Sequence, residues 1–271
     1  MLEDFTAQLQ TGLVFFIFGA AVCTVVEAVF AGEKQTIRSR LRGFSLYLFL
    51  ITSGAFAAML MGKLARDMWI VPLLRLDLTA APISDHWLWS LLGYALFPFL
   101  GVVVSEFVFY FFHRLQHTVP LLWHFHKVHH SIEELNAFNN YHHVAEAFVR
   151  IPLMTIPIAL FIDLSVPKTT ITTVLIVIAS HIPHANTKIR YGIFRYFLSE
   201  PRYHRIHHSI EAHHQDKNFA FVFPIWDVLF GTAHFPARDE YPKTGLTHMR
   251  EPKTIWQYLF PQISREHSGA K

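Results

Sequence analysis

The sequence has very little cysteine and little charge. Its one cysteine, Cys23, has no partner in the chain, which excludes an internal disulfide framework and a cysteine-based metal site. Charged residues make up only 16% of the chain, whereas about 25% is usual for soluble proteins. Hydrophobic residues reach 52% and fall in long runs. This composition argues against an ordinary cytosolic enzyme and predicts an integral membrane protein.

Several familiar motifs are also missing. We find no GxGxxG dinucleotide fingerprint and no His-Pro-Gly-Gly haem segment, so we expect a separate electron donor rather than a fused one. The net charge of +3 comes from scattered basic residues that flank apolar runs, which gives no indication of a nucleic-acid partner. Acidic Glu3 and Asp4, rather than lysine or arginine, precede the first apolar run, which argues against a cleaved signal peptide.

Three apolar runs, at about 13–31, 43–62 and 87–112, are each long enough to cross a hydrocarbon layer of about 30 Å. Residues 1–112 are therefore predicted to form a transmembrane anchor. The link between the first two runs is basic and carries Lys34, Arg38, Arg40 and Arg42. By the positive-inside rule this link lies in the cytoplasm, which places the amino terminus outside and His113, after the third run, on the cytoplasmic face.

A fourth apolar region, residues 144–180, is interrupted by Pro152, Pro157, Asp163 and Pro167. Its two halves are each short for a membrane span, so we expect a helical hairpin that crosses a thinned layer or inserts only partly. The hairpin separates a first histidine block, residues 113–143, from a second block and C-terminal cap, residues 181–271. If the hairpin crosses, both histidine blocks lie on the cytoplasmic face.

Histidine is the residue in excess. The chain has nineteen, and fifteen of them lie between His113 and His214. They recur as HRLQH (113–117), HKVHH (126–130), HIPH (181–184) and HRIHH (204–208). On a helix, residues three or four apart share a face, so each set converges on one point. Pro183 breaks a regular helix, so His181 and His184 are expected to meet at a helix end.

Burying ten imidazoles without a ligand would leave many polar nitrogens unsatisfied, so this pattern predicts metal binding. Four to six ligands fill a first-row metal ion, and ten imidazoles therefore suit two ions. Imidazole by itself does not choose among iron, zinc, copper and nickel.

With the later Asp216-Lys-Asn218-Phe-Ala and Trp226-Asp-Val-Leu-Phe-Gly-Thr232 segments, these motifs resemble the fatty acid hydroxylase/sterol desaturase superfamily over about His113 to His234. The resemblance implies an all-α fold, with a membrane helical bundle and a cytosolic helical cap that holds a histidine-ligated pair of irons; a purified protein could carry zinc instead. It also implies O2-dependent attack on lipid C–H bonds. Electrons would come from a separate ferredoxin-, flavodoxin- or cytochrome-type carrier.

The same resemblance maps metal ligands onto His113, His117, His126, His129, His130, His184, His204, His207 and His208, and less firmly onto His181 and His143. His143 is matched because Glu146 follows it, and His142 has no such match. His213 and His214 stay outside the predicted set. Glu146, Asn186, Asp216 and Asn218 are expected to hold ligand imidazoles through their other nitrogen, and a loop cap is the alternative for the last three.

The leading functional hypothesis is a membrane-bound di-iron enzyme that hydroxylates a fatty acyl, sterol or related lipid. Desaturation by the same site is the alternative, and we favour hydroxylation because desaturation also needs a second, well-placed C–H bond. A metal transporter is a second class, but its ligands would lie inside the spanning helices, whereas the histidine motifs of this chain follow or flank the apolar runs. A structural zinc protein without turnover is a third class. Arg190, Arg195, Arg202 and Arg205 are predicted to contact either an acidic electron carrier or the membrane surface.

Overall fold

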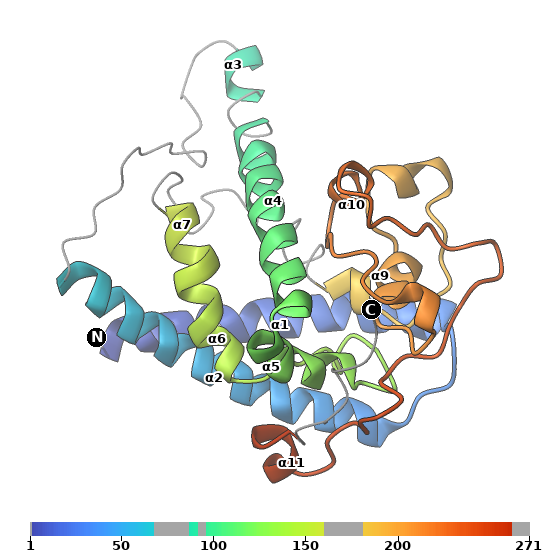
Figure 1. Cartoon of the computed structure of the whole chain (residues 1–271). Helices are drawn as coiled ribbons and strands as arrows, with labels where there is room; N and C mark the ends of the chain where they lie inside the picture. The colour runs from blue at the N-terminus through green and yellow to red at the C-terminus, as the bar shows by residue number, and fades with distance from the viewer. Residues whose placement is uncertain (1, 68–86, 92–95, 160–180, 262–271) are drawn as a thin grey trace.

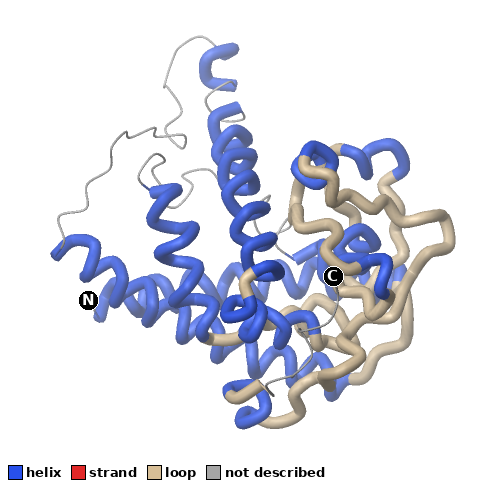
Figure 2. The backbone as a smooth tube through the Cα atoms, viewed as in Figure 1, coloured by secondary structure: helices blue, strands red, loops and turns tan. Residues whose placement is uncertain are grey.

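The computed structural model describes residues 2–67, 87–91, 96–159 and 181–261 (Figure 1). Within these ranges all regular structure is helical, and extended segments meet only in isolated β-bridges. Helices dominate the N-terminal half, whereas long loops connect short helices in the C-terminal part (Figure 2). The prediction of a helical fold is confirmed for this part of the chain.

Two long helices, α1 (Leu2–Phe30) and α2 (Ile37–Asp67), lie side by side and run in opposite directions (Figure 1). Within them, Phe5–Phe30 and Ile37–Met61 are long and apolar enough to cross a membrane. Their apolar side chains largely face outward, for example Val25, which is 66% exposed. Such outward apolar surface is what a lipid environment requires and what a buried core helix lacks.

The third apolar run contains a short helix, α3 (Trp87–Leu91), and a long one, α4 (Phe97–Thr118), separated by residues outside the described part. Helix α4 continues beyond the end of the apolar run at residue 112 and includes His113 and His117. Both imidazoles therefore project from one face of a rigid helix, one turn apart.

The expected hairpin is described only in its first half. There α6 (Ala145–Arg150), a π-helical turn η2 (Ile151–Thr155) and α7 (Ile156–Ala159) follow one another without a break. The widened turn contains Pro152, whose missing N–H and bulky ring disfavour a regular α-turn. The predicted turn and the second half lie outside the described residues.

The remaining elements are short and carry most of the functional residues. Helix α5 (Pro120–His130) follows α4 directly, and a proline at its first position favours the new helix start. The C-terminal part contains η3 (Ile182–His184), η4 (Gly192–Tyr196), α9 (Pro201–His207), η5 (Ala212–His214), α10 (Ile225–Leu229) and α11 (Ile255–Leu259). These segments gather beside the end of the α1–α2 pair that carries the connecting link (Figure 1).

The α1–α2 link is fastened to the histidine-bearing segments. Ala31 forms a β-bridge with Thr187, and the Gly32 N–H donates to the Asn186 carbonyl at 3.0 Å. Near the end of α1 the buried Glu27 carboxylate accepts the backbone N–H groups of Ala137 and Asn186, both at 2.8 Å. The link and the histidine segments are therefore one packed unit on one side of the two long helices.

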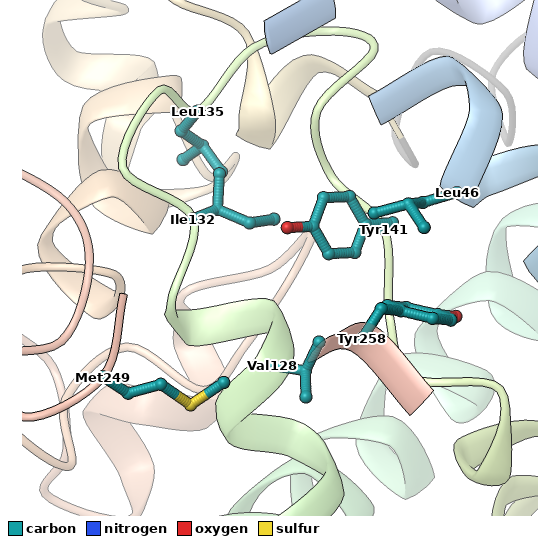
Figure 3. Close-up of a cluster of buried hydrophobic side chains, with 7 residues drawn as sticks. All are labelled: Leu46, Val128, Ile132, Leu135, Tyr141, Met249 and Tyr258. Atoms are coloured by element: carbon teal, nitrogen blue, oxygen red, sulfur yellow. The ribbon is translucent and has the colours of Figure 1, made fainter. Parts of the chain in front are cut away.

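A core of buried apolar side chains orients α5 (Figure 3). Val128 lies on this side of the helix, packed with residues from α2, the loop after α5 and α11. Side chains two positions apart on a helix point in nearly opposite directions, so burying Val128 turns His126 and His130 the other way. The cluster comprises Leu46, Val128, Ile132, Leu135, Tyr141, Met249 and Tyr258.

Two glycines permit close approaches that hold the long helices to the histidine segments. A Cβ on Gly43 of α2 would lie 2.4 Å from the Phe138 carbonyl oxygen, and one on Gly19 of α1 would lie 2.4 Å from His181 Nδ1. Neither distance is sterically possible, so only glycine fits at these two contacts.

Candidate metal centre

Nine buried or nearly buried histidines form two adjoining clusters. The first cluster takes residues from α4, α5 and α9, and the second takes residues from α5, η3 and the end of α9. In each cluster the ring nitrogens lie within 4.8 Å of one another. The first cluster is His113, His117, His126, His130 and His207; the second is His129, His184, His204 and His208.

The same ring atom, Nε2, points inward in both clusters. In the first, His113 Nε2 lies 3.1 Å from that of His126 and 3.0 Å from that of His207, and the His117–His130 pair is at 3.1 Å. In the second, His184 Nε2 lies 3.3 Å from that of His129 and 3.0 Å from that of His204. His208 Nε2 completes it at 3.2 Å from His204.

Backbone carbonyls decide which nitrogen carries the proton. Nδ1 lies 2.7 Å from the Phe219 oxygen in His113, 2.7 Å from the Lys217 oxygen in His207 and 3.0 Å from the Tyr141 oxygen in His129. A carbonyl oxygen only accepts hydrogen bonds, so Nδ1 is the donor in each case. In a neutral ring the inward Nε2 is then a bare lone pair.

Neutral rings are the expected state here. Burial, and then the neighbouring imidazoles, hold the pKa of His130, His207 and His208 well below the usual value for histidine. Lone pairs that face one another without a proton repel, unless a cation lies between them.

The spacing fits a metal ion. An ion about 2.1 Å from each imidazole nitrogen separates neighbouring ligand nitrogens by about 3.0 Å in octahedral and about 3.4 Å in tetrahedral coordination. The observed separations of 3.0 to 3.3 Å match this range. The donor set therefore fits one ion in each cluster.

The two clusters are in direct contact through their imidazole rings. His129 and His130 are neighbours in sequence but belong to different clusters. The His130 ring stacks on His208 with centroids 4.5 Å apart, and His204 stacks beside His207 at 5.2 Å. Two ions held here would be close neighbours.

Glu146 contacts the first cluster. Its carboxylate lies 3.2 Å from Nδ1 of His126 and accepts a hydrogen bond from Gln116. Burial by itself would raise the pKa of Glu146, but His142 and His126 hold that pKa well below its usual range. An ionised, buried carboxylate thus orients a ligand imidazole and adds negative charge beside the cluster.

The sequence motif selected His143, but the structure brings His142 to the clusters. The His142 ring stacks on His129 with centroids 3.8 Å apart, and its Nδ1 lies 3.2 Å from Glu146. His143 turns away: its Nε2 bonds the Leu259 carbonyl and its Nδ1 accepts the Ala145 N–H. Both ring nitrogens of His143 are therefore engaged outside the clusters.

His181 also lies outside both clusters. It precedes the η3 turn, and its buried ring packs near Phe16 of α1 and Tyr47 of α2, with centroids 5.9 Å and 6.5 Å away. His184, three residues later, enters the second cluster. The tight 3₁₀ turn around Pro183 thus separates two residues that we expected to converge.

The three expected supporting residues differ in what they contact. Asp216 is exposed but reaches Nδ1 of His117 at 3.5 Å. Asn186 bonds Glu33 and Tyr241, and Asn218 bonds the Tyr203 and His234 backbone. Asn186 and Asn218 therefore fasten the loops around the clusters, as in the loop-cap alternative.

Asp227 is a supporting residue that the motif contained but to which the sequence assigned no role. Its fully buried carboxylate accepts hydrogen bonds from the Phe219 and Ala220 N–H groups, both at 2.8 Å. It also accepts from the hydroxyls of Tyr203 at 3.0 Å and Thr232 at 2.7 Å. Because the Phe219 carbonyl orients His113, Asp227 positions a cluster residue through one intervening peptide.

Two of the four arginines expected at a docking surface are buried. Arg202 donates to carbonyls of the 237–240 loop, and Arg205 bonds the Pro242 carbonyl and pairs with Glu33 at 2.8 Å. They stabilise the fold, and the prediction that they contact a carrier or membrane is wrong. Arg190 remains exposed.

A small pocket of about 130 Å³ opens onto the first cluster. His117, His130 and His207 line its inner side, and the segments 209–216 and 245–248 contribute to the rest. The cluster is thus accessible to small molecules from the loop side.

The described residues thus form a helical, histidine-rich protein with two candidate membrane helices and two clusters of imidazoles that could hold metal ions. Residues 98–232 match the fatty acid hydroxylase family. The chain belongs to the fatty acid hydroxylase superfamily, which confirms the resemblance seen in its motifs.

Curated relatives agree with this assignment. Human alkylglycerol monooxygenase is 34% identical over 167 residues, which are 62% of this chain and 35% of that protein. An ornithine lipid hydroxylase of Rhizobium tropici is 35% identical over 154 residues, 55% of this chain and 45% of that protein. Alkylglycerol monooxygenase of Xenopus tropicalis is 27% identical over 250 residues, 91% of this chain and 52% of that protein. The matched segments thus span about half or less of these relatives, and no solved structure matches the chain.

Proposed function

We propose that this protein is a membrane-bound, O2-dependent lipid hydroxylase with two iron ions. The observation that supports this proposal most is the convergence of nine imidazole Nε2 atoms in two adjoining clusters. We leave His143 and His181 out of the proposed ligand set, because both lie outside these clusters. The names of the relatives, a monooxygenase and a hydroxylase of lipids, support the reaction class.

The chain's own residues hold and shield the centre. Neutral imidazoles bind through Nε2, while carbonyls and Glu146 fix several of the rings through Nδ1. Burial of most of these imidazoles limits contact with bulk water to the small pocket at the first cluster, which protects a reactive site from side reactions. When bound, two irons would supply the activation of O2 that attack on an unactivated C–H bond requires. Electrons would come from a separate ferredoxin-, flavodoxin- or cytochrome-type protein.

Hydroxylation and desaturation are separated by the fate of oxygen. Purified protein, reconstituted with a lipid substrate and an electron donor, should insert one labelled oxygen atom from ¹⁸O2 into the product. An unsaturated product without label, with the label only in water, would support the desaturase alternative. Bound metal without any O2 consumption would support the zinc protein without turnover.

We further propose that the metal centre faces the cytoplasm. The α1–α2 link packs on the histidine segments, so the two share one side of the membrane. In the link, Arg40 pairs with Glu27 and Arg42 with Glu251, whereas Lys34 and Arg38 are exposed. These two exposed cations support a cytoplasmic link by the positive-inside rule.

Cysteine labelling tests this topology. Ile37 is 77% exposed, so an Ile37→Cys variant should react with a membrane-impermeant maleimide only after the cells are permeabilised. Cys23 is buried and serves as an unreactive background. A Lys63→Cys variant, near the opposite end of α2, is the matched control and should react in intact cells. The reverse pattern would contradict the proposed orientation.

A further inference from the structure

A third group of ligand-type side chains lies outside the two clusters. His214 Nε2 lies 2.9 Å from Glu240 Oε1, and His234 Nε2 lies 3.2 Å from the same oxygen. The second carboxylate oxygen, Oε2, is 3.3 Å from His234. We call these three residues the loop site, because they join the loop around 209–217 to the loop at 232–240.

Further contacts hold the side chains of His214 and Glu240 and the backbone of His234. His214 Nδ1 lies 2.8 Å from the Ser209 hydroxyl oxygen, and the His234 backbone N–H donates to Asn218 Oδ1 at 2.6 Å. Glu240 Oε2 accepts the Ala237 N–H at 2.7 Å. Ligands whose other atoms are already bonded keep their geometry, which favours ion binding over a flexible surface cluster.

The electrostatics also suit a cation. Burial by itself would raise the pKa of Glu240, but the Ala237 N–H and the two histidines lower it, so the carboxylate is ionised. Burial lowers the pKa of His214, while the adjacent Glu240 carboxylate acts in the opposite direction. The His214 side chain is fully buried, whereas those of His234 and Glu240 are 30% and 21% exposed. One side of the loop site is therefore open to water.

We propose that the loop site binds a divalent transition-metal ion of the zinc class. Two imidazole nitrogens and one carboxylate form a donor set typical of zinc, and water on the open side would complete the coordination. The ligand-atom separations of 2.9 to 3.3 Å are close to the spacing of ligands around such an ion. His213 is not required, because its ring is 62% exposed and lies beside Glu211.

The bound ion would stabilise the loop 209–217, which lies beside the first cluster. The loop 209–217 carries His214 on one side, and on the other its Lys217 carbonyl orients His207. Ser209 and Asp216 of this loop also line the pocket that opens onto the first cluster. An ion in the loop site would tie this loop to residues 234–240 and restrict its movement.

Metal counting on the purified full-length protein tests the proposal. After equilibration with zinc at buffered, low free concentration, elemental analysis should find three ions per chain in the wild type. The Glu240→Gln and His234→Ala variants should each contain two ions per chain. The matched control is His124→Ala, which removes an imidazole that belongs to no ligand group of the described residues and should retain three.

The outcomes separate this proposal from the proposed centre. If the wild type holds only one ion per chain and Glu240→Gln holds none, the result supports the loop site and argues against the other two sites. Equal zinc content in the wild type and Glu240→Gln would overturn the loop site and leave a hydrogen-bonded cluster. Glutamine keeps the size of the side chain, so this variant decides the question even if His234→Ala fails to fold.

Discussion

Alanine at His129 or His207 is expected to remove about one metal ion per chain and to lower turnover at least about a hundredfold. Each substitution deletes an inward Nε2 ligand, one from each cluster, without touching the apolar helices. Both variants should remain in the membrane fraction. Elemental analysis of the purified protein and product formation from the lipid are the measurements.

His143→Ala is the matched control for this experiment. It removes a buried imidazole close in sequence to the clusters, but one whose nitrogens bond Leu259 and Ala145 instead. It should retain its metal content and lose about 2 kcal/mol of stability, because it removes two hydrogen bonds of about 1 kcal/mol each. Full metal content in both His129→Ala and His207→Ala would show that the clusters do not bind the ions.

Asp227→Ala is expected to lower the free energy of unfolding by about 3 to 5 kcal/mol, as for the loss of an acceptor shared by several buried donors. Four buried donors, from Phe219, Ala220, Tyr203 and Thr232, would lose their acceptor. For a chain of this size we expect the melting temperature to fall by about 10 °C or more. The first cluster should also lose metal, because the Phe219 carbonyl would no longer hold His113.

Asp216→Ala provides the comparison, since that carboxylate is 71% exposed. This variant should lower the melting temperature less than Asp227→Ala, because an exposed ion pair contributes little to stability. A small loss is expected, because residue 216 has a φ of 56°, where alanine is less favourable than aspartate. Thermal unfolding in detergent, followed by circular dichroism, measures both variants. Equal melting temperatures for Asp227→Ala and Asp216→Ala would refute the role assigned to Asp227.

Local spacing explains why most of the candidate site was predictable. His113 and His117 are one helical turn apart in α4, and His126 and His130 are one turn apart in α5. A helix places such pairs on one face whatever the rest of the fold does. The excess of imidazole over any ordinary structural need then pointed to metal.

Irregular segments are where prediction from the sequence stopped. His142 and His143 lie in the loop before α6, where no periodicity tells which side chain turns inward. His181 and His184 flank a 3₁₀ turn whose direction depends on contacts with Gly19 and Phe16. Arg202 and Arg205 were predicted to lie on the surface. Their hydrogen-bond and ion-pair partners are distant in the sequence, so the sequence alone did not show that these side chains are buried.

The sequence by itself determined the two membrane-length helices, the helical class of the described residues and the histidines that share a helix face. Only the tertiary structure decided that these faces meet as two adjoining clusters. It also decided that His142, rather than His143, lies beside them and that Asp227 positions the Phe219 peptide next to His113. It alone brought His214, His234 and Glu240 together. The physical reason is range: helix periodicity acts over one or two turns, whereas loop paths depend on hydrogen bonds between segments that are distant in the chain.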